Sequence, residues 1–214
     1  MLRATRESPR MFESDFVDFF SRTHPAVVPL MFLPTSAWLL YHGVGAGGVS
    51  LSASAALFVG GFTVWTLTEY WLHRLFFHWK PQFRGGERLH FLVHGVHHTW
   101  PKDKYRLVMP PAVSITLFFL FLGIFWLLLG DRLVWPFHAG FVIGYMSYDL
   151  THYYIHHYNP RSEYGRRLKK NHMLHHFKDH GSRFGVSSMI WDRVFGTTGA
   201  KASGPDVSVA MPGR

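Results

Sequence analysis

The chain has 214 residues, of which 17% are aromatic, only 16% are charged and none is cysteine. Soluble globular domains usually carry roughly 25% charged residues, so this composition indicates a membrane protein. Without cysteine, disulfides, thiolate zinc sites and iron–sulfur clusters are excluded, and imidazole and carboxylate remain as the strong metal ligands.

The first 24 residues combine a polar start with an aromatic stripe made of Phe12, Phe16, Phe19 and Phe20. This i, i+4, i+7, i+8 spacing predicts a short amphipathic helix that starts at Ser8 and Pro9. We expect residues 1–24 to lie on the membrane surface, and packing of the helix against protein is the alternative. The segment lacks the small-residue cleavage site of a secretory signal peptide.

Four apolar runs cover residues 25–41, 49–72, 112–130 and 133–154. Each run approaches the roughly 20 residues that cross a bilayer core of about 30 Å. Short connections join the runs into two hairpins. The first connection, GVGAGG, matches the G-x-G-x-x-G pattern of dinucleotide-binding loops, but no strand precedes it, so we interpret it as a turn.

The cations lie almost entirely on one side of this topology. Of the 22 Lys and Arg residues, four lie in residues 1–24, seven in residues 73–111 and ten after residue 155, whereas only Arg132 lies in a hairpin on the opposite side. By the positive-inside rule the cation-rich side is cytoplasmic. The net charge of +9 then reflects topology and attraction to membrane lipid, and no nucleic-acid partner is expected.

The predicted fold class is therefore an all-α integral membrane protein. It has four transmembrane helices in two hairpins and a histidine-rich helical cap on the cytosolic side. Residues 25–198 form this domain, and residues 199–214, rich in Gly, Pro and Ser, form a flexible tail. We expect a multi-pass protein of the bacterial inner membrane, or of the ER membrane if the chain is eukaryotic.

Sixteen histidines occur in the chain, and most of them fall in clusters. On a helix, three histidines of HFLVHGVHH lie at relative angles of about 0°, 300° and 40°, and therefore share one face. HMLHH repeats this spacing, and histidine pairs stand at the ends of two predicted spans. The topology brings all four clusters to one side of the membrane: His73 and His78; His94, His97 and His98; His152 and His156; His172, His175 and His176.

About ten imidazoles are too many for one ion, so we predict two metal ions with about five nitrogens each and an open position on each. A structural zinc site would stop at four ligands. Neutral imidazole suits zinc, copper and iron, and an open pair of iron ions can activate dioxygen. Ordinary core or surface histidines are the alternative, which the repeated ligand spacing disfavours.

Five strings in this order resemble the fatty acid hydroxylase superfamily: HRLFFH, HFLVHGVHH followed by TWPKDKYRLVMPP, YDLTHYYIHH, HMLHHF and FGVSSMIWDRVFGT. The resemblance covers roughly residues 20–198. PKDKYRLVMPP and YDLTHY favour the fatty acid 2-hydroxylase branch over sterol-oxidising and carotenoid-hydroxylating relatives. The last part of the closing string, WDRVFGT at residues 191–197, is a candidate element that covers the site.

The resemblance implies two iron ions in the working enzyme, although purified relatives can carry zinc. Carried over by position, the metal ligands are the ten clustered histidines named above. His90 and His157 belong to the same strings but are expected beside the ligands. We interpret the four histidines outside the clusters as ordinary residues: His24, His42, His138 and His180.

The activity that the resemblance implies is hydroxylation of the carbon next to the carbonyl, the 2-position, of a fatty acid or of a fatty acyl chain of a lipid such as a sphingolipid. Dioxygen is the cosubstrate. Many eukaryotic members carry an N-terminal cytochrome domain with a His-Pro-Gly-Gly string, which this chain lacks, so we expect a separate electron donor of cytochrome or ferredoxin type. Three acids near the clusters, Glu69, Asp149 and Asp179, are expected to orient imidazoles, and solvated or capping acids are the alternative.

Three other functions compete with this one. The first is a related hydroxylase or desaturase acting on a sterol, carotenoid or ether lipid. The second is a metal transporter, which should place its ligands near the middle of the bilayer, whereas the clusters lie at its edge. The third is an inactive metal-binding scaffold.

Overall fold

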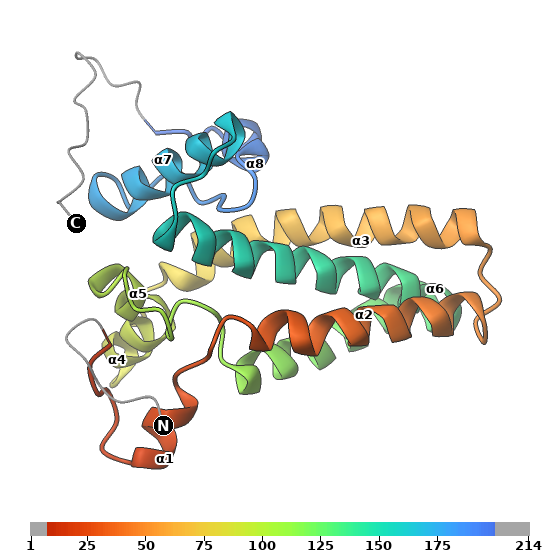
Figure 1. Ribbon diagram of the computed structural model, residues 1–214, viewed down its shortest axis with the longest axis horizontal. Coiled ribbons are helices and arrows are strands. Elements are labelled where there is room, and N and C mark those ends of the chain that lie inside the picture. The colour runs from red at the N-terminus through yellow and green to blue at the C-terminus, as the bar shows by residue number, and fades with distance from the viewer. Residues whose placement is uncertain (1–7, 200–214) are drawn as a thin grey trace.

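The computed structural model describes residues 8–199, and every regular element in that range is helical (Figure 1). The predicted all-α class is therefore confirmed for this part of the chain, whereas the predicted tail from residue 200 onward lies outside it. The elements are α1 (Asp15–Phe20), α2 (Val27–Val44), α3 (Leu51–Trp71), η1 (Leu72–Phe77), α4 (Gly86–His90), η2 (Phe91–Gly95), α5 (Val96–Thr99), α6 (Pro111–His157), α7 (Glu163–Phe177) and α8 (Ile190–Val194).

Three helices of the described range are long and apolar enough to cross a membrane: Val27–Val44, Leu51–Phe77 and Pro111–His157. The third is interrupted at Gly130, whose φ of 75° and ψ of 169° are not helical. Glycine adopts this positive φ without a steric penalty. α6 therefore folds back on itself, and its two arms, residues 111–129 and 131–157, run alongside α2 and α3 (Figure 1).

Glycines bring α3 and the second arm of α6 into backbone contact. A Cβ atom added to Gly61 would lie 1.9 Å from the Phe137 carbonyl oxygen, and one added to Gly140 would lie 1.9 Å from the Phe58 carbonyl oxygen. Small residues at such positions let helices in a membrane pack closely. Beside this contact, the buried Trp65 ring packs edge-on against other core aromatic rings.

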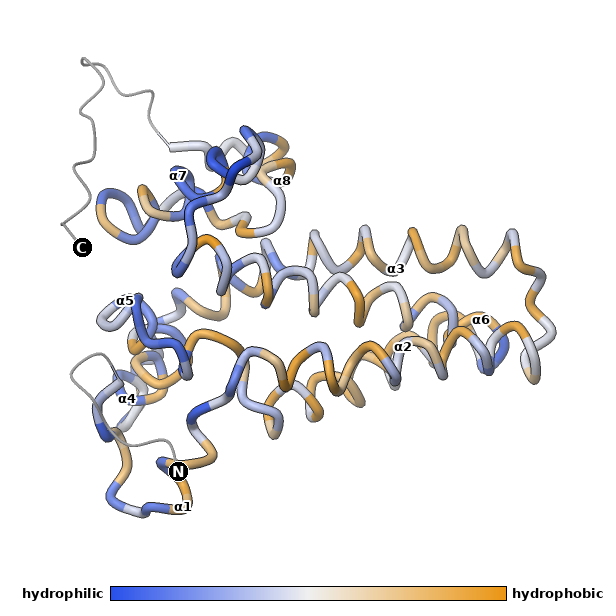
Figure 2. Tube along the Cα trace, viewed as in Figure 1, coloured by the Kyte–Doolittle hydropathy of each residue, from blue (hydrophilic) through white to orange (hydrophobic). Residues whose placement is uncertain are grey.

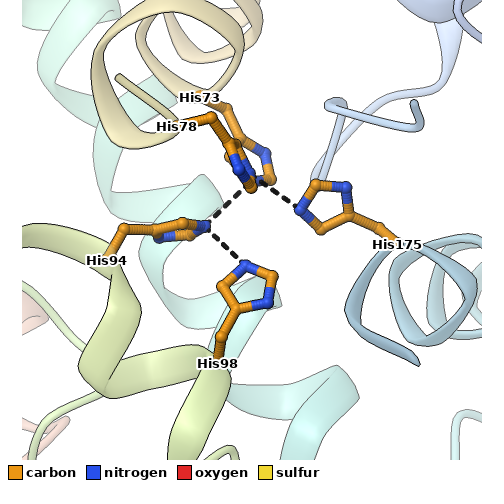
Figure 3. Close-up of side chains that lie close together, drawn as sticks. All are labelled: His73, His78, His94, His98 and His175. Atoms are coloured by element: carbon orange, nitrogen blue, oxygen red, sulfur yellow. Dashed lines mark hydrogen bonds between the residues drawn. The ribbon is translucent and has the colours of Figure 1, made fainter. Parts of the chain in front are cut away.

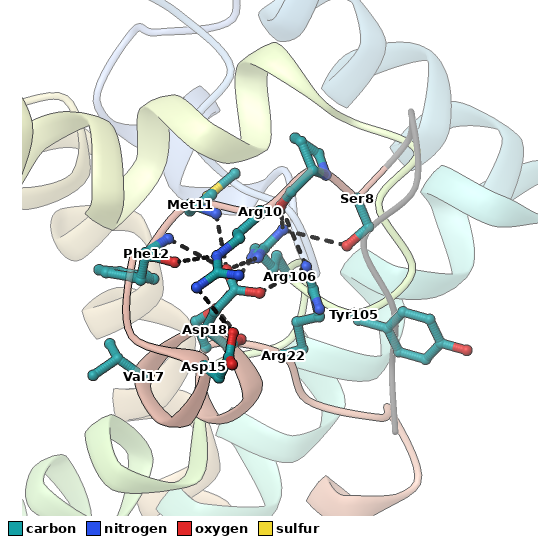
Figure 4. A network of polar contacts seen from close by, with 12 residues as sticks. Ser8, Arg10, Met11, Phe12, Asp15, Val17, Asp18, Arg22, Tyr105 and Arg106 are labelled. Atoms are coloured by element: carbon teal, nitrogen blue, oxygen red, sulfur yellow. Dashed lines mark hydrogen bonds and ion pairs between the residues drawn. The ribbon is translucent and has the colours of Figure 1, made fainter.

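The N-terminal helix starts later than the sequence predicts. Its N-cap is Ser14, whose hydroxyl accepts a hydrogen bond from the Val17 amide, so the predicted start at Ser8 is wrong. The reason lies in the buried Asp18 carboxylate, which accepts from the Met11 amide at 2.8 Å and pairs with Arg106 at 3.0 Å (Figure 4). These contacts hold residues 8–13 in a non-helical path against the loop that contains Arg106.

The shorter elements gather at one end of the long helices. α4, η2, α5, α7 and α8 form a cap around the ends of η1 and α6 (Figure 1). Hydrophilic residues are concentrated in this cap, whereas the long helices are largely hydrophobic (Figure 2). The polar and apolar parts of the molecule are thus separated along its longest axis.

Candidate metal centre

Two groups of five histidines converge where the long helices meet the cap. In each group, one nitrogen of every ring lies within 4.8 Å of the corresponding nitrogens of the other four. The first histidine group, drawn in Figure 3, consists of His73, His78, His94, His98 and His175. The second histidine group consists of His97, His152, His156, His172 and His176. All ten histidines predicted as ligands therefore lie together.

A π-helical turn explains how His73 and His78 can serve the same group. Five residues apart on an α-helix, they would point about 140° away from each other. In η1, however, the backbone follows i→i+5 hydrogen bonding, which places such residues one above the other. A second π-helical turn, η2, precedes the part of the cap that carries His97 and His98.

The nitrogen positions fit a metal ion better than they fit hydrogen bonds. His172 Nε2 lies 2.9 Å from His152 Nε2, 2.9 Å from His156 Nε2 and 3.0 Å from His176 Nε2. A neutral imidazole has one proton, so these four nitrogens cannot all satisfy one another as donors and acceptors.

Ligand geometry accounts for the same distances. A metal–nitrogen bond of about 2.1 Å with ligand angles of 90–110° places neighbouring ligand nitrogens roughly 3.0–3.4 Å apart. In the first histidine group, His94 Nε2 lies 3.2 Å from His73 Nε2 and 2.9 Å from His98 Nε2 (Figure 3). Each group can therefore hold one ion. The two groups adjoin, because the ring centroids of His98 and His176 are 4.1 Å apart.

Backbone carbonyls set the tautomer of two rings in the first histidine group. His73 Nδ1 lies 2.6 Å from the Phe184 carbonyl oxygen, and His175 Nδ1 lies 2.7 Å from the Ser182 carbonyl oxygen. Because a carbonyl only accepts, both Nδ1 atoms carry the proton, and each Nε2 keeps a lone pair for a metal ion. These carbonyls were not predicted, since a backbone group leaves no signature in the sequence.

Carboxylates hold the segment that supplies these carbonyls. The buried Glu69 accepts from the Val186 amide at 2.7 Å and from the Ser187 amide at 2.8 Å, and it also binds the Ser187 hydroxyl. Asp179 binds the Ser182 hydroxyl at 2.6 Å. Glu69 and Asp179 thus act on the imidazoles through the backbone.

Asp149 has hydrogen-bond partners of a different kind. It accepts from the Met109 amide at 3.2 Å and from the Tyr145 hydroxyl at 3.0 Å. Its hydrogen bonds among residues 8–199 therefore tie the loop before α6 to the second arm of that helix, rather than orienting an imidazole. The expected role for Asp149 is not supported by these contacts.

The sequence does not predict a role for Asp192, although this residue lies in WDRVFGT, residues 191–197. Its buried carboxylate accepts from the Phe184 amide at 2.8 Å, the Gly185 amide at 2.9 Å and the Thr197 hydroxyl at 2.8 Å. One of these bonds holds the peptide group that contains the carbonyl facing His73 Nδ1, and another holds the peptide group before it. Asp192 is therefore a positioning residue for the first histidine group.

We expect Asp192→Asn to loosen the first histidine group. The asparagine amide would have to turn its own N–H groups toward one of the three donors. A buried donor left without an acceptor lowers the free energy of unfolding by about 1–3 kcal/mol. Metal affinity, measured by competition with a chelator, should fall by about tenfold. Asp131→Asn is the control, because Asp131 is exposed at the far hairpin and, among residues 8–199, accepts from the Trp126 indole alone; equal affinities in the two variants would contradict the role of Asp192.

Burial lowers the pKa of histidines in the cap. The pKa of His175 falls to about 4 and that of His98 to about 3, with desolvation as the main cause. Both rings are therefore neutral at pH 7 and ready to bind a metal ion. In the unfolded chain the same rings protonate near pH 6.5.

The difference in histidine pKa between the folded and the unfolded chain predicts that acid destabilises the metal-free protein. A lowered pKa in the folded state gives stability that is present above pH 6.5 and is lost as the pH falls towards 4. For the fully buried His175 the loss at pH 5 is about 2 kcal/mol. Thermal unfolding of chelator-treated protein should show a lower Tm at pH 5 than at pH 7.5, and His175→Gln should reduce that difference; an unchanged difference in the variant would contradict the assignment.

The remaining six histidines lie outside both groups. His42 stacks on Trp38 at the other end of the long helices, and His138 is buried among phenylalanine rings. His180 is exposed, although its ring centroid lies 4.9 Å from that of His98. The remaining three are His24, His90 and His157.

Comparison with known proteins gives a consistent result. The family model described as fatty acid hydroxylase matches residues 58–197. The dihydroceramide fatty acyl 2-hydroxylase FAH1 of Arabidopsis thaliana is 40% identical over 194 residues, which cover 91% of this chain and 81% of that protein. The ceramide very long chain fatty acid hydroxylase SCS7 of Saccharomyces cerevisiae is 40% identical over 187 residues, which cover 86% of this chain and 48% of that protein.

A solved structure also matches. It is described as full-length scs7p with only the hydroxylase domain visible, and it superposes with a TM-score of 0.81 at 38% identity, covering 89% of this chain and 71% of that chain. The resemblance predicted from the five sequence strings is confirmed by these matches. The chain belongs to the fatty acid hydroxylase family.

Proposed function

We propose that this protein is an O2-dependent monooxygenase that hydroxylates the 2-position of a fatty acid or of a fatty acyl chain of a lipid. The observation that carries the proposal is the pair of adjoining five-histidine groups in a chain that is 40% identical to a dihydroceramide fatty acyl 2-hydroxylase. The histidines come from η1, the end of α6 and the cap helices, so the groups lie at one end of the long helices rather than in the middle, where a transporter would need its ligands.

The ten histidines of the two groups would hold two iron ions, one in each group. Iron bound there supplies the redox chemistry that activates dioxygen, which zinc cannot supply. The protein's own contribution is to keep the imidazoles neutral, through burial, and to fix their orientation. The carbonyls of Ser182 and Phe184 do this for His175 and His73.

We further propose that α2, α3 with η1, and the two arms of α6 span the membrane as four segments, so that residues 25–198 form one membrane-embedded domain. The cap then lies on the cytoplasmic side, because the Lys and Arg residues are concentrated at that end. The exposed Phe16, Phe19 and Phe20 of α1 fit a segment that rests on the membrane surface.

The acyl substrate would reach the histidine groups through the apolar bundle. A cavity between α2, α3 and α6 is lined by rings that include Phe32, Trp65, Phe118 and Phe141. Tyr148, beside Trp65, stacks on His152 of the second histidine group with ring centroids 5.8 Å apart. An acyl tail in this bundle would exclude water and place the carbon next to its carbonyl near the groups.

Two electrons and two protons must be supplied for each hydroxylation. Iron held by the two histidine groups would consume these electrons and would have to be re-reduced from outside the site after each turnover. A separate donor of cytochrome or ferredoxin type is therefore part of the proposal.

The test is expression in a host whose lipids lack 2-hydroxyacyl chains, followed by lipid mass spectrometry under ¹⁸O2. We expect 2-hydroxyacyl lipids that carry one ¹⁸O atom, and we expect them to be absent from a His97→Ala control. Supplying free acid, acyl thioester and ceramide separately to membranes identifies the substrate class. Products hydroxylated on a sterol, carotenoid or ether lipid, without 2-hydroxyacyl chains, would overturn the proposal.

A further inference from the structure

Helix α7 has two opposite faces with different chemistry. Its metal-facing side carries His172, His175 and His176, which fall within roughly 100° on a helical wheel and are all buried. The opposite side carries Arg166, Arg167, Lys170 and Phe177, which also fall within roughly 100° of one another and are all exposed. Lys178, which is exposed, follows directly after the helix.

The outer face carries several cations and one exposed ring. Phe177 is 69% exposed and lies two turns after Lys170 on this face. The only carboxylate on this part of α7 is Glu163, which pairs with Arg167. We define the basic face as Arg166, Arg167, Lys170, Phe177 and Lys178; its charge is positive and suits an acidic partner.

The basic face is one helix thickness from the histidine groups. A helix with its side chains is about 10–12 Å across, a distance over which electrons tunnel between redox centres in proteins. The exposed Phe177 is next in sequence to His176 of the second histidine group, and their ring centroids are 5.9 Å apart. A redox partner seated on the basic face would therefore be close to both groups.

Hydroxylation by the proposed function requires such a partner. One oxygen atom of O2 enters the substrate C–H bond as hydroxyl, and the other leaves as water with two protons and two electrons. Two one-electron carriers supply these electrons in succession. Encounters between redox proteins are short-lived and bury little surface, so long-range charge attraction largely determines their rate.

We propose that the basic face of α7 is the docking surface for an acidic one-electron carrier protein. This inference rests on the proposed function, because it assumes that electrons are consumed at the histidine groups. An anionic membrane surface is the competing occupant. α7 lies in the polar cap at one end of the long helices, away from their apolar stretches, which favours a soluble partner (Figures 1 and 2).

Binding of the acidic haem domain of cytochrome b5 tests the surface without turnover. Zinc-loaded protein in neutral phosphatidylcholine nanodiscs is compared with a variant carrying Arg166→Glu, Lys170→Glu and Lys178→Glu. The variant should bind the haem domain at least about tenfold more weakly at low ionic strength, and its affinity should depend less on salt. Unchanged zinc content shows that the variant is folded.

A matched control carries Lys80→Glu, Arg84→Glu and Arg88→Glu. These exposed cations lie in the same cap but outside α7, so the net charge changes equally. The control should bind the haem domain within about twofold of the wild type. Equal losses in the two variants would overturn the docking surface, because binding would then follow net charge alone.

Two further measurements separate the competing outcomes. Loss of affinity for phosphatidylserine nanodiscs, with cytochrome affinity kept, would show that the basic face contacts lipid and would overturn the inference. Iron-loaded enzyme supplied with ascorbate and a phenazine mediator should hydroxylate equally in the wild type and the α7 variant. Absence of product from the wild type under these conditions would overturn the proposed function, while the binding comparison would still decide the docking surface.

Discussion

Replacing His94 by alanine is expected to remove one metal ion and to abolish hydroxylation. The ring is buried, and its Nε2 contacts the corresponding atoms of both His73 and His98, so its loss removes a ligand from the middle of the first histidine group. Elemental analysis should show one ion per chain instead of two. Activity should fall by at least about 100-fold, since even residues that only support a ligand cost 10- to 100-fold.

Two companion variants make this result specific. His97→Ala should remove the ion of the second histidine group and leave that of the first, so the double variant should hold none. His42→Ala should keep both ions and full activity, because His42 packs between Trp38 and Trp135 at the other end of the long helices. Equal metal content and turnover in His94→Ala and His42→Ala would refute the ligand assignment.

The second large effect concerns stability. Gly140→Ala would place a methyl group 1.9 Å from the Phe58 carbonyl oxygen, and the backbone of α3 cannot yield as a flexible side chain can. The helices must separate, and we expect a loss of about 3 kcal/mol or more. A thermal unfolding scan in detergent should show the lower Tm directly.

Gly123→Ala is the matched control for this substitution. Gly123 lies in the first arm of α6, and a Cβ atom added there would meet nothing within 4 Å. Alanine favours a helix over glycine by about 1 kcal/mol, so this variant should be as stable as the wild type or slightly more stable. A Tm for Gly140→Ala similar to that of Gly123→Ala would disprove the close contact between α3 and α6.

The sequence predicted the ten clustered histidines because ligand spacing on helices is a local pattern. Apolar length likewise predicted the long helices. The reversal in α6 lies at Gly130, next to the predicted Asp131–Arg132 turn, because glycine tolerates the required φ. The pairing of His73 with His78 on one face depends on a π-helical turn, which ordinary helix periodicity does not predict.

Other features depended on contacts between distant parts of the chain. Ser8 and Pro9 predict a start for α1 that is too early. Asp18 holds the residues before the helix in another conformation, through contacts that include Arg106. The carbonyl partners of His73 and His175 come from the segment of residues 182–187. The partner of His73 lies more than a hundred positions after it in the chain. Such partners are decided by tertiary packing and carry no residue-type signal.

The order in which the ribosome delivers the ligands has a consequence for biogenesis. Both histidine groups take ligands from α7, so neither set is complete until His175 and His176 have left the exit tunnel. The hairpins upstream can insert into the bilayer before that point. Metal loading should therefore be a late maturation step, and newly made protein deprived of metal should have an inserted bundle with a cap that proteases attack first.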